Sequence, residues 1–294
     1  MVREESRSFV ISLIARLLQC EYRWQQSSFD PICIDKYDTF GFLLLPSVFP
    51  AHEMADIIES AEAIWSADET QLPNEEVRVT YFFERSPHLT RLVTDDRIYP
   101  VITQLVGKDP IWVGSEGNIS NRQRVNWHSD RKYYREGEGH WIDYPQIKLM
   151  IYLQGLTRDT GCLRVIPGSH RMPYHDELGD QETNGDSNPF GVDGPDLPAA
   201  ALEVEPGDVI LFNHCCWHAA YGGADNRRYI AMKFAARPDD RDQLVSLKRY
   251  TPRIFQPHDV FLRHENRRIR RLVEALPLYA SGHLLKRRGA TLSN

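Results

Sequence analysis

His128 and Asp130 lie two residues apart in RVNWHSDRKYY, residues 124–134, and this spacing could hold a metal ion. Side chains at positions i and i+2 of a β-strand point to the same face, so the imidazole and the carboxylate could reach one ion together. A lone His-x-Asp is frequent by chance, and it equally fits two polar residues on the solvated face of a strand. The pair becomes informative only if the rest of the chain supplies further ligands.

A second histidine is available in GDVILFNHCCWHAAYGG, residues 207–223, which contains His214 and His218. Two histidines and one carboxylate form the facial triad of non-haem Fe(II) oxygenases, which leaves three coordination positions open. His214 and His218 share the same strand parity, so the residues alone leave both open as the third ligand. The neighbouring Cys215 and Cys216 would also permit a zinc site, but adjacent residues of a strand alternate faces and the spacing of structural zinc sites is missing.

A pair of arginines could hold an organic co-substrate. Arg227 and Arg228 begin the run RRYIAMKF, and Gly222-Gly223 before them predicts a tight turn that places this strand alongside the previous one. A guanidinium can bind a carboxylate such as that of 2-oxoglutarate through two parallel hydrogen bonds. Arg228 shares its parity with Ile230 and the later apolar residues of the run, so a simple apolar-inside rule would turn Arg228 inward.

The composition is that of a soluble globular protein. Of 294 residues, 41% are hydrophobic and 26% are charged, and the net charge of −6 gives no sign of a nucleic-acid surface. The apolar run FVISLIARLLQC, residues 9–20, is too short to span a bilayer and is typical of an amphipathic helix, so we expect no membrane partner. Basic residues gather near the C-terminus, where we expect the solvated face of a helix: Arg263, Arg267, Arg268, Arg270, Arg271, Lys286, Arg287 and Arg288.

The cysteines indicate a redox compartment. There are five of them, an odd number, and they form no C-x-x-C pair. This pattern favours reduced thiols and a cytoplasmic protein over a disulfide framework.

Periodicity divides the chain into a helical part and a strand-rich part. Residues up to about 70 alternate helical patterns with one strand in FGFLLLPSVF, and Pro50 begins a helix in PAHEMADIIESAEAIW. From about residue 110, short β-rich runs are separated by Gly, Pro, Asp and Asn, which predicts an antiparallel sandwich or barrel covered by helices. Residues 171–199 are polar with little periodicity, which predicts either a disordered excursion or a lid whose acidic residues favour a cationic or neutral substrate.

Four motifs in order resemble the phytanoyl-CoA dioxygenase family of Fe(II)/2-oxoglutarate oxygenases: WHSD, DTGCLRVIPGSHR, EPGDVILFNHCCWHAA and RRYIAMKF, within roughly residues 124–236. GCLRVIPGSH is the most specific of them, and Tyr37 to Trp65 is similar to the N-terminal segment of that family. The resemblance implies a mainly β fold with flanking α-helices and a double-stranded β-helix (jelly-roll, cupin-like) core, with the metal at its open end.

The resemblance also implies roles for single residues. The family's ligand follows the glycine of a Gly-Asp pair by eleven residues, which from Gly207 selects His218 and leaves His214 as a neighbour. The spacing back from Phe234 implies that Arg227, rather than Arg228, holds 2-oxoglutarate. The implied Fe(II) ligands, which are also the catalytic group, are His128, Asp130 and His218.

Two further positions bear on the co-substrate. Tyr134 stands where ectoine-hydroxylase-like members carry a pocket aromatic, so it could contact 2-oxoglutarate or only pack. Ala219-Ala220 replaces the family's usual Gly-Ser after the ligand histidine, which removes a hydroxyl that could help to hold the co-substrate carboxylate.

The implied activity is hydroxylation of an unactivated C–H bond of a small molecule with O2 and 2-oxoglutarate, which releases succinate and CO2. Asp130 favours hydroxylation over halogenation, because halogenating relatives carry a small residue there. Desaturation, ring formation, a redox-neutral cupin-like metalloenzyme and a silent binding protein stay open as alternatives. We expect one domain over residues 1–294, with helical parts at about 1–70 and 257–294, a core at about 110–236 and a lid-like loop at about 171–199. The residues identify neither the substrate nor the oligomeric state.

Overall fold

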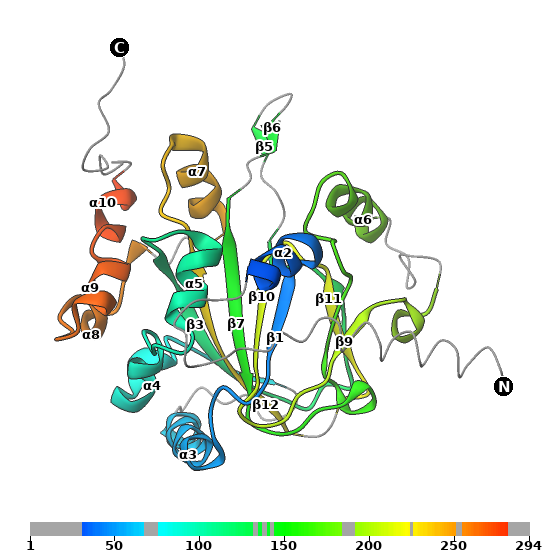
Figure 1. The fold of residues 1–294 in the computed structure, drawn as a ribbon, viewed down its shortest axis with the longest axis horizontal. Helices are drawn as coiled ribbons and strands as arrows, with labels where there is room; N and C mark the ends of the chain where they lie inside the picture. The colour runs from blue at the N-terminus through cyan, green and yellow to red at the C-terminus, as the bar shows by residue number, and fades with distance from the viewer. Residues whose placement is uncertain are drawn as a thin grey trace.

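The computed structural model describes residues 31–67, 76–131, 135–136, 140–141, 144–183, 192–223, 226–250 and 255–281. Two antiparallel sheets form its centre, with helices on their outer sides (Figure 1). The large sheet has the strand order β1-β10-β7-β12-β3-β2, and the small sheet has the order β4-β11-β8-β9. A hairpin of β5 and β6 stands apart from both. The strands are β1 (Phe42–Leu45), β2 (Glu76–Thr80), β3 (Ile111–Ser120), β4 (Arg124–His128), β5 (Arg135–Glu136), β6 (His140–Trp141), β7 (Gln146–Tyr152), β8 (Leu163–Val165), β9 (Ala200–Leu202), β10 (Val209–Asn213), β11 (His218–Tyr221) and β12 (Arg227–Ala235).

The helices that cover the large sheet form the main core with it. Alternate residues of the strands, such as Leu149 on β7 and Met232 on β12, point outward into this core. The helix α3 directs Ile57 and Trp65 into the same core, as the amphipathic pattern after Pro50 predicts. The helices are α2 (Pro31–Phe40), α3 (Ala51–Ala67), α4 (Pro87–Leu92), α5 (Tyr99–Val106), α6 (Tyr174–Thr183), α7 (Arg241–Tyr250), α8 (Asp259–Leu262), α9 (Arg267–Val273) and α10 (Leu276–Ala280).

A second apolar core lies between the two sheets. Phe212 and Met150 of the large sheet meet Val165 and Leu202 of the small sheet there. Because both faces of the large sheet are covered, its central strand β7 is buried along its whole length. Apolar residues therefore occupy both parities of these strands, and parity alone does not indicate which side faces the interior.

The segment at 171–199 contains regular structure where it is described. It includes α6 and a short 3₁₀ helix at Gly194–Asp196, which the weak periodicity did not predict. Leu178 and Leu197 pack against the outer face of the small sheet, next to Trp217. These two apolar residues of the segment thus cover a sheet.

Two expectations are corrected by the structure. The turn at Gly222-Gly223 does not place β12 beside β11; β12 pairs with β3 and β7, so the chain crosses from one sheet to the other. Cys33 is disulfide-bonded, so the thiols are not all reduced, although Cys162, Cys215 and Cys216 are free. A chain with an odd number of cysteines can still form one disulfide bond. The cytoplasmic location and the division into parts stay predictions.

Two segments lie outside the described residues, namely the apolar run at 9–20 and the basic residues from Lys286 onward. Among the described helices, none is long and apolar enough to cross a membrane.

Candidate metal centre and co-substrate site

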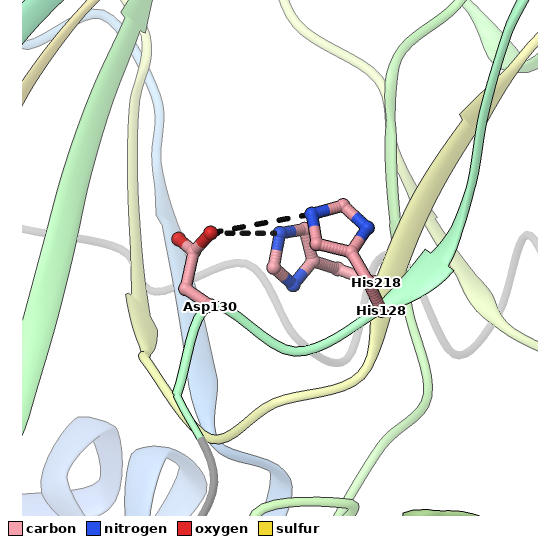
Figure 2. A group of neighbouring side chains, drawn as sticks. All are labelled: His128, Asp130 and His218. Atoms are coloured by element: carbon pink, nitrogen blue, oxygen red, sulfur yellow. Dashed lines mark ion pairs between the residues drawn. The ribbon is translucent and has the colours of Figure 1, made fainter. Parts of the chain in front are cut away.

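Three side chains converge at the end of the space between the sheets. One ligand atom from each of His128, Asp130 and His218 lies within 4.8 Å of the other two (Figure 2). Oδ1 of Asp130 is 4.0 Å from Nε2 of His128 and 3.9 Å from Nε2 of His218. Three donor atoms that face one another across such distances leave room for one ion between them.

The strands fix this convergence. His128 ends β4 and His218 begins β11, and their Cα atoms are direct partners in the antiparallel pair. Side chains of partners on the same face stand close together, and the two imidazole ring centroids are 4.3 Å apart. Asp130 follows β4 by two residues and lies opposite the two rings.

Backbone carbonyls determine which ring nitrogen of each histidine is available to bind a metal. Nδ1 of His128 lies 2.8 Å from the carbonyl of Asn126, and Nδ1 of His218 lies 2.8 Å from the carbonyl of Cys216. A proton on each Nδ1 completes these hydrogen bonds, so both Nε2 atoms present lone pairs towards Asp130. Histidines that bind metals typically donate their other ring N–H to a carbonyl or carboxylate in this way.

The electrostatics keep the group in its ligating state. Burial lowers the pKa of His218 to about 3, and the neighbouring His128 acts in the same direction. Burial raises the pKa of Asp130, but the neighbouring charged groups together outweigh burial and hold this pKa well below its usual value. The largest of their contributions comes from the ammonium of Lys148, 3.1 Å from Oδ2. A neutral imidazole and an ionised carboxylate are the forms that bind a metal.

His214 and the two cysteines after it stand apart from this group. The strand β10 ends at Asn213, so His214 lies in a turn, and the expectation that His214 and His218 share one strand is wrong. His214 is buried, its pKa is lowered to about 3 by burial, and its carbonyl accepts a hydrogen bond from the backbone of Arg131. Sγ of Cys216 donates to the carbonyl of Gly41. Among the described residues, the only group of His, Cys, Asp and Glu side chains that could hold a metal ion is the one that contains His218.

The two arginines point in opposite directions. Arg228 pairs with Glu62 of α3 on the outer side of the large sheet, at 3.1 Å. Arg227 shares the inner parity of β12 with Tyr229, is 4% exposed and donates from Nη1 to the carbonyl of Gly161 at 3.1 Å. The apolar-inside rule, which would turn Arg228 inward, therefore fails, because α3 and its neighbours make the other face of β12 apolar as well.

The surroundings of Arg227 fit a carboxylate ligand. Its Nε has no hydrogen-bond partner, and no described acidic side chain forms an ion pair with it. A buried guanidinium without a counter-charge is costly, so a bound carboxylate would offset the cost. Tyr152 lies close enough for Arg227 to influence its pKa, and Asn118 and Tyr229 are hydrogen-bonded to each other further along the inner face. Tyr134 lies outside the described residues, so its part in this site stays a prediction.

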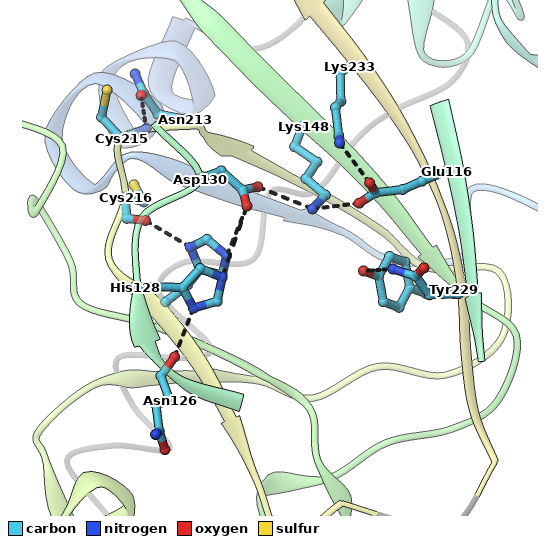
Figure 3. Close-up of polar contacts among 12 residues, drawn as sticks. Glu116, Asn126, His128, Asp130, Lys148, Asn213, Cys215, Cys216, Tyr229 and Lys233 are labelled. Carbon is cyan, nitrogen blue, oxygen red and sulfur yellow. Dashed lines mark hydrogen bonds and ion pairs between the residues drawn. The ribbon is translucent and has the colours of Figure 1, made fainter. Parts of the chain in front are cut away.

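A buried charge cluster that was not expected from the sequence lies beside the metal group. Lys148 contacts Asp130 on one side and Glu116, at 2.9 Å, on the other, and Lys233 contacts Glu116 at 2.7 Å (Figure 3). Arg78 also reaches Glu116. A signal was present, since Lys148 and Lys233 are the single charged residues within apolar stretches of their strands. Such lone charges in buried strands indicate a polar interior partner.

Two antiparallel sheets that present two histidines and a carboxylate between them are the arrangement of jelly-roll non-haem metal oxygenases. The chain belongs to the phytanoyl-CoA dioxygenase family, because the model of that family, phytanoyl-CoA dioxygenase (PhyH), matches residues 37–229. Members of this family depend on Fe(II), 2-oxoglutarate and O2. The family and the mainly β, jelly-roll fold expected from the motifs are thereby confirmed.

Individual relatives agree with this assignment. The chain is 28% identical over 154 residues to the ectoine dioxygenase of Bordetella bronchiseptica, which covers 47% of this chain and 49% of the relative. This match thus spans about half the length of that relative. The dioxygenase lolE1 of Epichloe uncinata is 24% identical over 236 residues, 71% of this chain and 83% of the relative. The structure of HygX from Streptomyces hygroscopicus with nickel and 2-oxoglutarate bound has a TM-score of 0.59 and 19% identity, covering 71% of this chain and 88% of that one.

Proposed function

We propose that this chain is an Fe(II)- and 2-oxoglutarate-dependent dioxygenase that hydroxylates an unactivated C–H bond of a small molecule and releases succinate and CO2. The observation that carries the proposal is the convergence of His128, Asp130 and His218 with both Nε2 atoms free of backbone bonds. Bound iron would supply the activation of O2 that an unactivated C–H bond requires.

The residues of the chain have distinct tasks in this proposal. His128, Asp130 and His218 would hold the ion on one side, which leaves the other side open to co-substrate and oxygen. Arg227 would bind the distal carboxylate of 2-oxoglutarate and so orient its keto-acid end. Asp130 occupies its coordination position as a carboxylate, which favours hydroxylation over halogenation. Desaturation or ring formation would use the same residues, because the placement of the substrate decides among these outcomes.

The decisive experiment measures binding and turnover separately. Metal-free protein is titrated with Mn(II) in place of Fe(II), then with 2-oxoglutarate, by calorimetry, and succinate release is assayed with Fe(II) in air. We expect one metal ion per chain and metal-dependent binding of 2-oxoglutarate, both lost in Asp130→Ala. The matched control is Asp193→Ala, an acid whose carboxylate bonds the backbone of Gly194. Metal binding without 2-oxoglutarate binding would favour a redox-neutral metalloprotein, and no metal binding would leave only a silent binding protein.

A further inference from the structure

A cavity of about 130 Å³ lies where β2 and the first half of β3 meet the segment before α8. One water needs only about 10–15 Å³ of such volume, so the cavity has room for a small organic group. Its walls include both charged and aromatic side chains. Those used below are Arg78, Tyr81, Glu84, Glu116, Lys233 and His258.

A β-bulge creates part of this space. The pairing of β12 with β3 steps from Lys233 opposite Gly114 to Phe234 opposite Trp112, so β3 has one extra residue. Gly114 has φ +120°, and a Cβ atom built there would meet nothing within 4 Å. Lys233 therefore stands across from a position that has no side chain, at the wall of an open space.

The charges around the cavity do not cancel. Among the described residues, the carboxylate of Glu116 is shared by three cations, Arg78, Lys148 and Lys233. Within the described part of the chain, Lys148 contacts one other acid, the proposed metal ligand Asp130. Glu84 adds no free acceptor, because its two oxygens accept from Trp112 and Ser115 and burial raises its pKa. The local charge is positive.

The co-substrate cannot supply the missing negative charge. Arg227 and Lys233 are six residues apart on the same face of β12, which at about 3.3 Å per residue separates their backbones by roughly 20 Å. A five-carbon diacid held at Arg227 does not span that distance. The cavity nevertheless adjoins the metal group, since the Lys148 ammonium alone separates Glu116 from Asp130 (Figure 3).

We propose that this cavity binds an anionic group of the organic substrate, a carboxylate or a phosphate, through Lys233 and Arg78. The proposal rests on the proposed function for the identity of the ligand as substrate. Lys233 is only 17% exposed, so an anion beside it is weakly screened, while Arg78 is 55% exposed and can adjust to reach the same group. Tyr81 and His258, whose ring centroids are 6.0 Å apart, would flank the organic part of the substrate.

This charge is opposite to the one that the acidic segment at 171–199 suggests. The difference is one of position. In that segment α6 packs on the outer face of the small sheet, whereas Lys233 lies on the inner face of the large sheet, where it and Arg78 contact Glu116. The groups nearest to the reacting carbon decide the substrate's charge, so we expect an anionic substrate.

The test uses metal-free protein, so that it does not depend on turnover. Inorganic phosphate and acetate are titrated separately by calorimetry, and the tighter of the two identifies the favoured anion. We expect saturable binding that weakens at least tenfold in Lys233→Met and Arg78→Met and is kept in Lys233→Arg. The control Arg228→Met, which removes a cation from the outer face, should bind as the unmodified chain does.

Two further variants keep the test decisive. Glu116→Gln removes the shared carboxylate and should tighten anion binding, which no unfolded variant would do. Arg227→Met removes the buried guanidinium of the proposed 2-oxoglutarate site, so any anion bound at Arg227 is lost in this variant while the binding at Lys233 is kept. The proposal is overturned if neither anion binds, if Glu116→Gln does not tighten binding, or if binding is lost in Arg227→Met and kept in Lys233→Met. Failure of the proposed function would appear separately, as absent metal binding.

Discussion

Replacing Arg227 with lysine is the perturbation whose effect on the co-substrate can best be worked out from the structure. The guanidinium is 4% exposed, and its one described hydrogen bond, from Nη1 to Gly161, leaves further donors for a ligand. A planar fork can make two parallel bonds to a carboxylate, whereas an ammonium keeps the charge but not the fork. The change therefore tests hydrogen-bond geometry at constant charge.

The expected magnitude follows from the bonds that are lost. A hydrogen bond to a charged group contributes about 1.5–3 kcal/mol. The loss of one of two such bonds should weaken 2-oxoglutarate binding roughly 10- to 100-fold, since each 1.4 kcal/mol or so is tenfold. Arg228→Lys is the matched control, because Arg228 forms a partly exposed pair with Glu62 that contributes about 0–1 kcal/mol. Its effect on 2-oxoglutarate binding should be close to none.

The assay is calorimetric binding of 2-oxoglutarate to the Mn(II)-loaded protein, followed by the 2-oxoglutarate dependence of succinate release. Thermal unfolding of both variants checks that the fold is intact. If Arg228→Lys weakens binding and Arg227→Lys does not, the inner face of β12 does not hold the co-substrate and the assignment of Arg227 is wrong.

Four other outcomes can be checked. His218→Ala should abolish metal binding and turnover, whereas His214→Ala should keep measurable activity; a metal-bound His214 in a Co(II) spectrum or crystal structure would contradict this. Gly161→Ala should raise the concentration of 2-oxoglutarate that the enzyme requires, since a Cβ atom there would lie 2.9 Å from Nη1 of Arg227. Gly168→Ala is the control, because it introduces the same backbone strain of about 1–3 kcal/mol but makes no contact with Arg227. Chelation should stop succinate release and Fe(II) should restore it. Limited proteolysis of residues 171–199 should slow when Fe(II), 2-oxoglutarate and a true substrate are present together, and cleavage indifferent to ligands would show the segment to be only a linker.

The strand-rich part of the fold could be predicted because its strands are short, apolar and separated by turn residues. β3, β7, β10 and β12 all lie within runs that the pattern marks as strands. Helices α4 and α5 were not predicted, and α6 was hidden by its polar composition, since it meets the small sheet mainly through Leu178. A helix that buries so few side chains gives almost no periodic signal.

The candidate site could be predicted for its ligands but not for its surroundings. The pairing of His128 with Asp130 was predicted from strand parity, although β4 ends at His128 and Asp130 lies two residues beyond it. The choice of His218 over His214 needed the family spacing, because the residues do not reveal that β10 ends before His214. The grouping around Glu116 could not be predicted, although the lone charges of Lys148 and Lys233 indicated a polar partner in the interior. Its members come from β2, β3, β7 and β12, and only the order of strands in the sheet makes them neighbours.

The pairing of His128 with His218 has a consequence for how the chain assembles. These two residues are 90 positions apart in the sequence, yet they are cross-strand partners. The register between β4 and β11 shifts by one residue next to them, so that Ala220 lies opposite Val125. A slip of one residue between β4 and β11 would turn one imidazole to the outer face. An ion that requires both imidazoles and Asp130 would bind only the chain with the correct alignment, and would stabilise it by mass action. The ion would thus stabilise the correct strand alignment as well as take part in the reaction. In a metal-free chain, the amide protons of β4 and β11 should exchange before those of the large sheet.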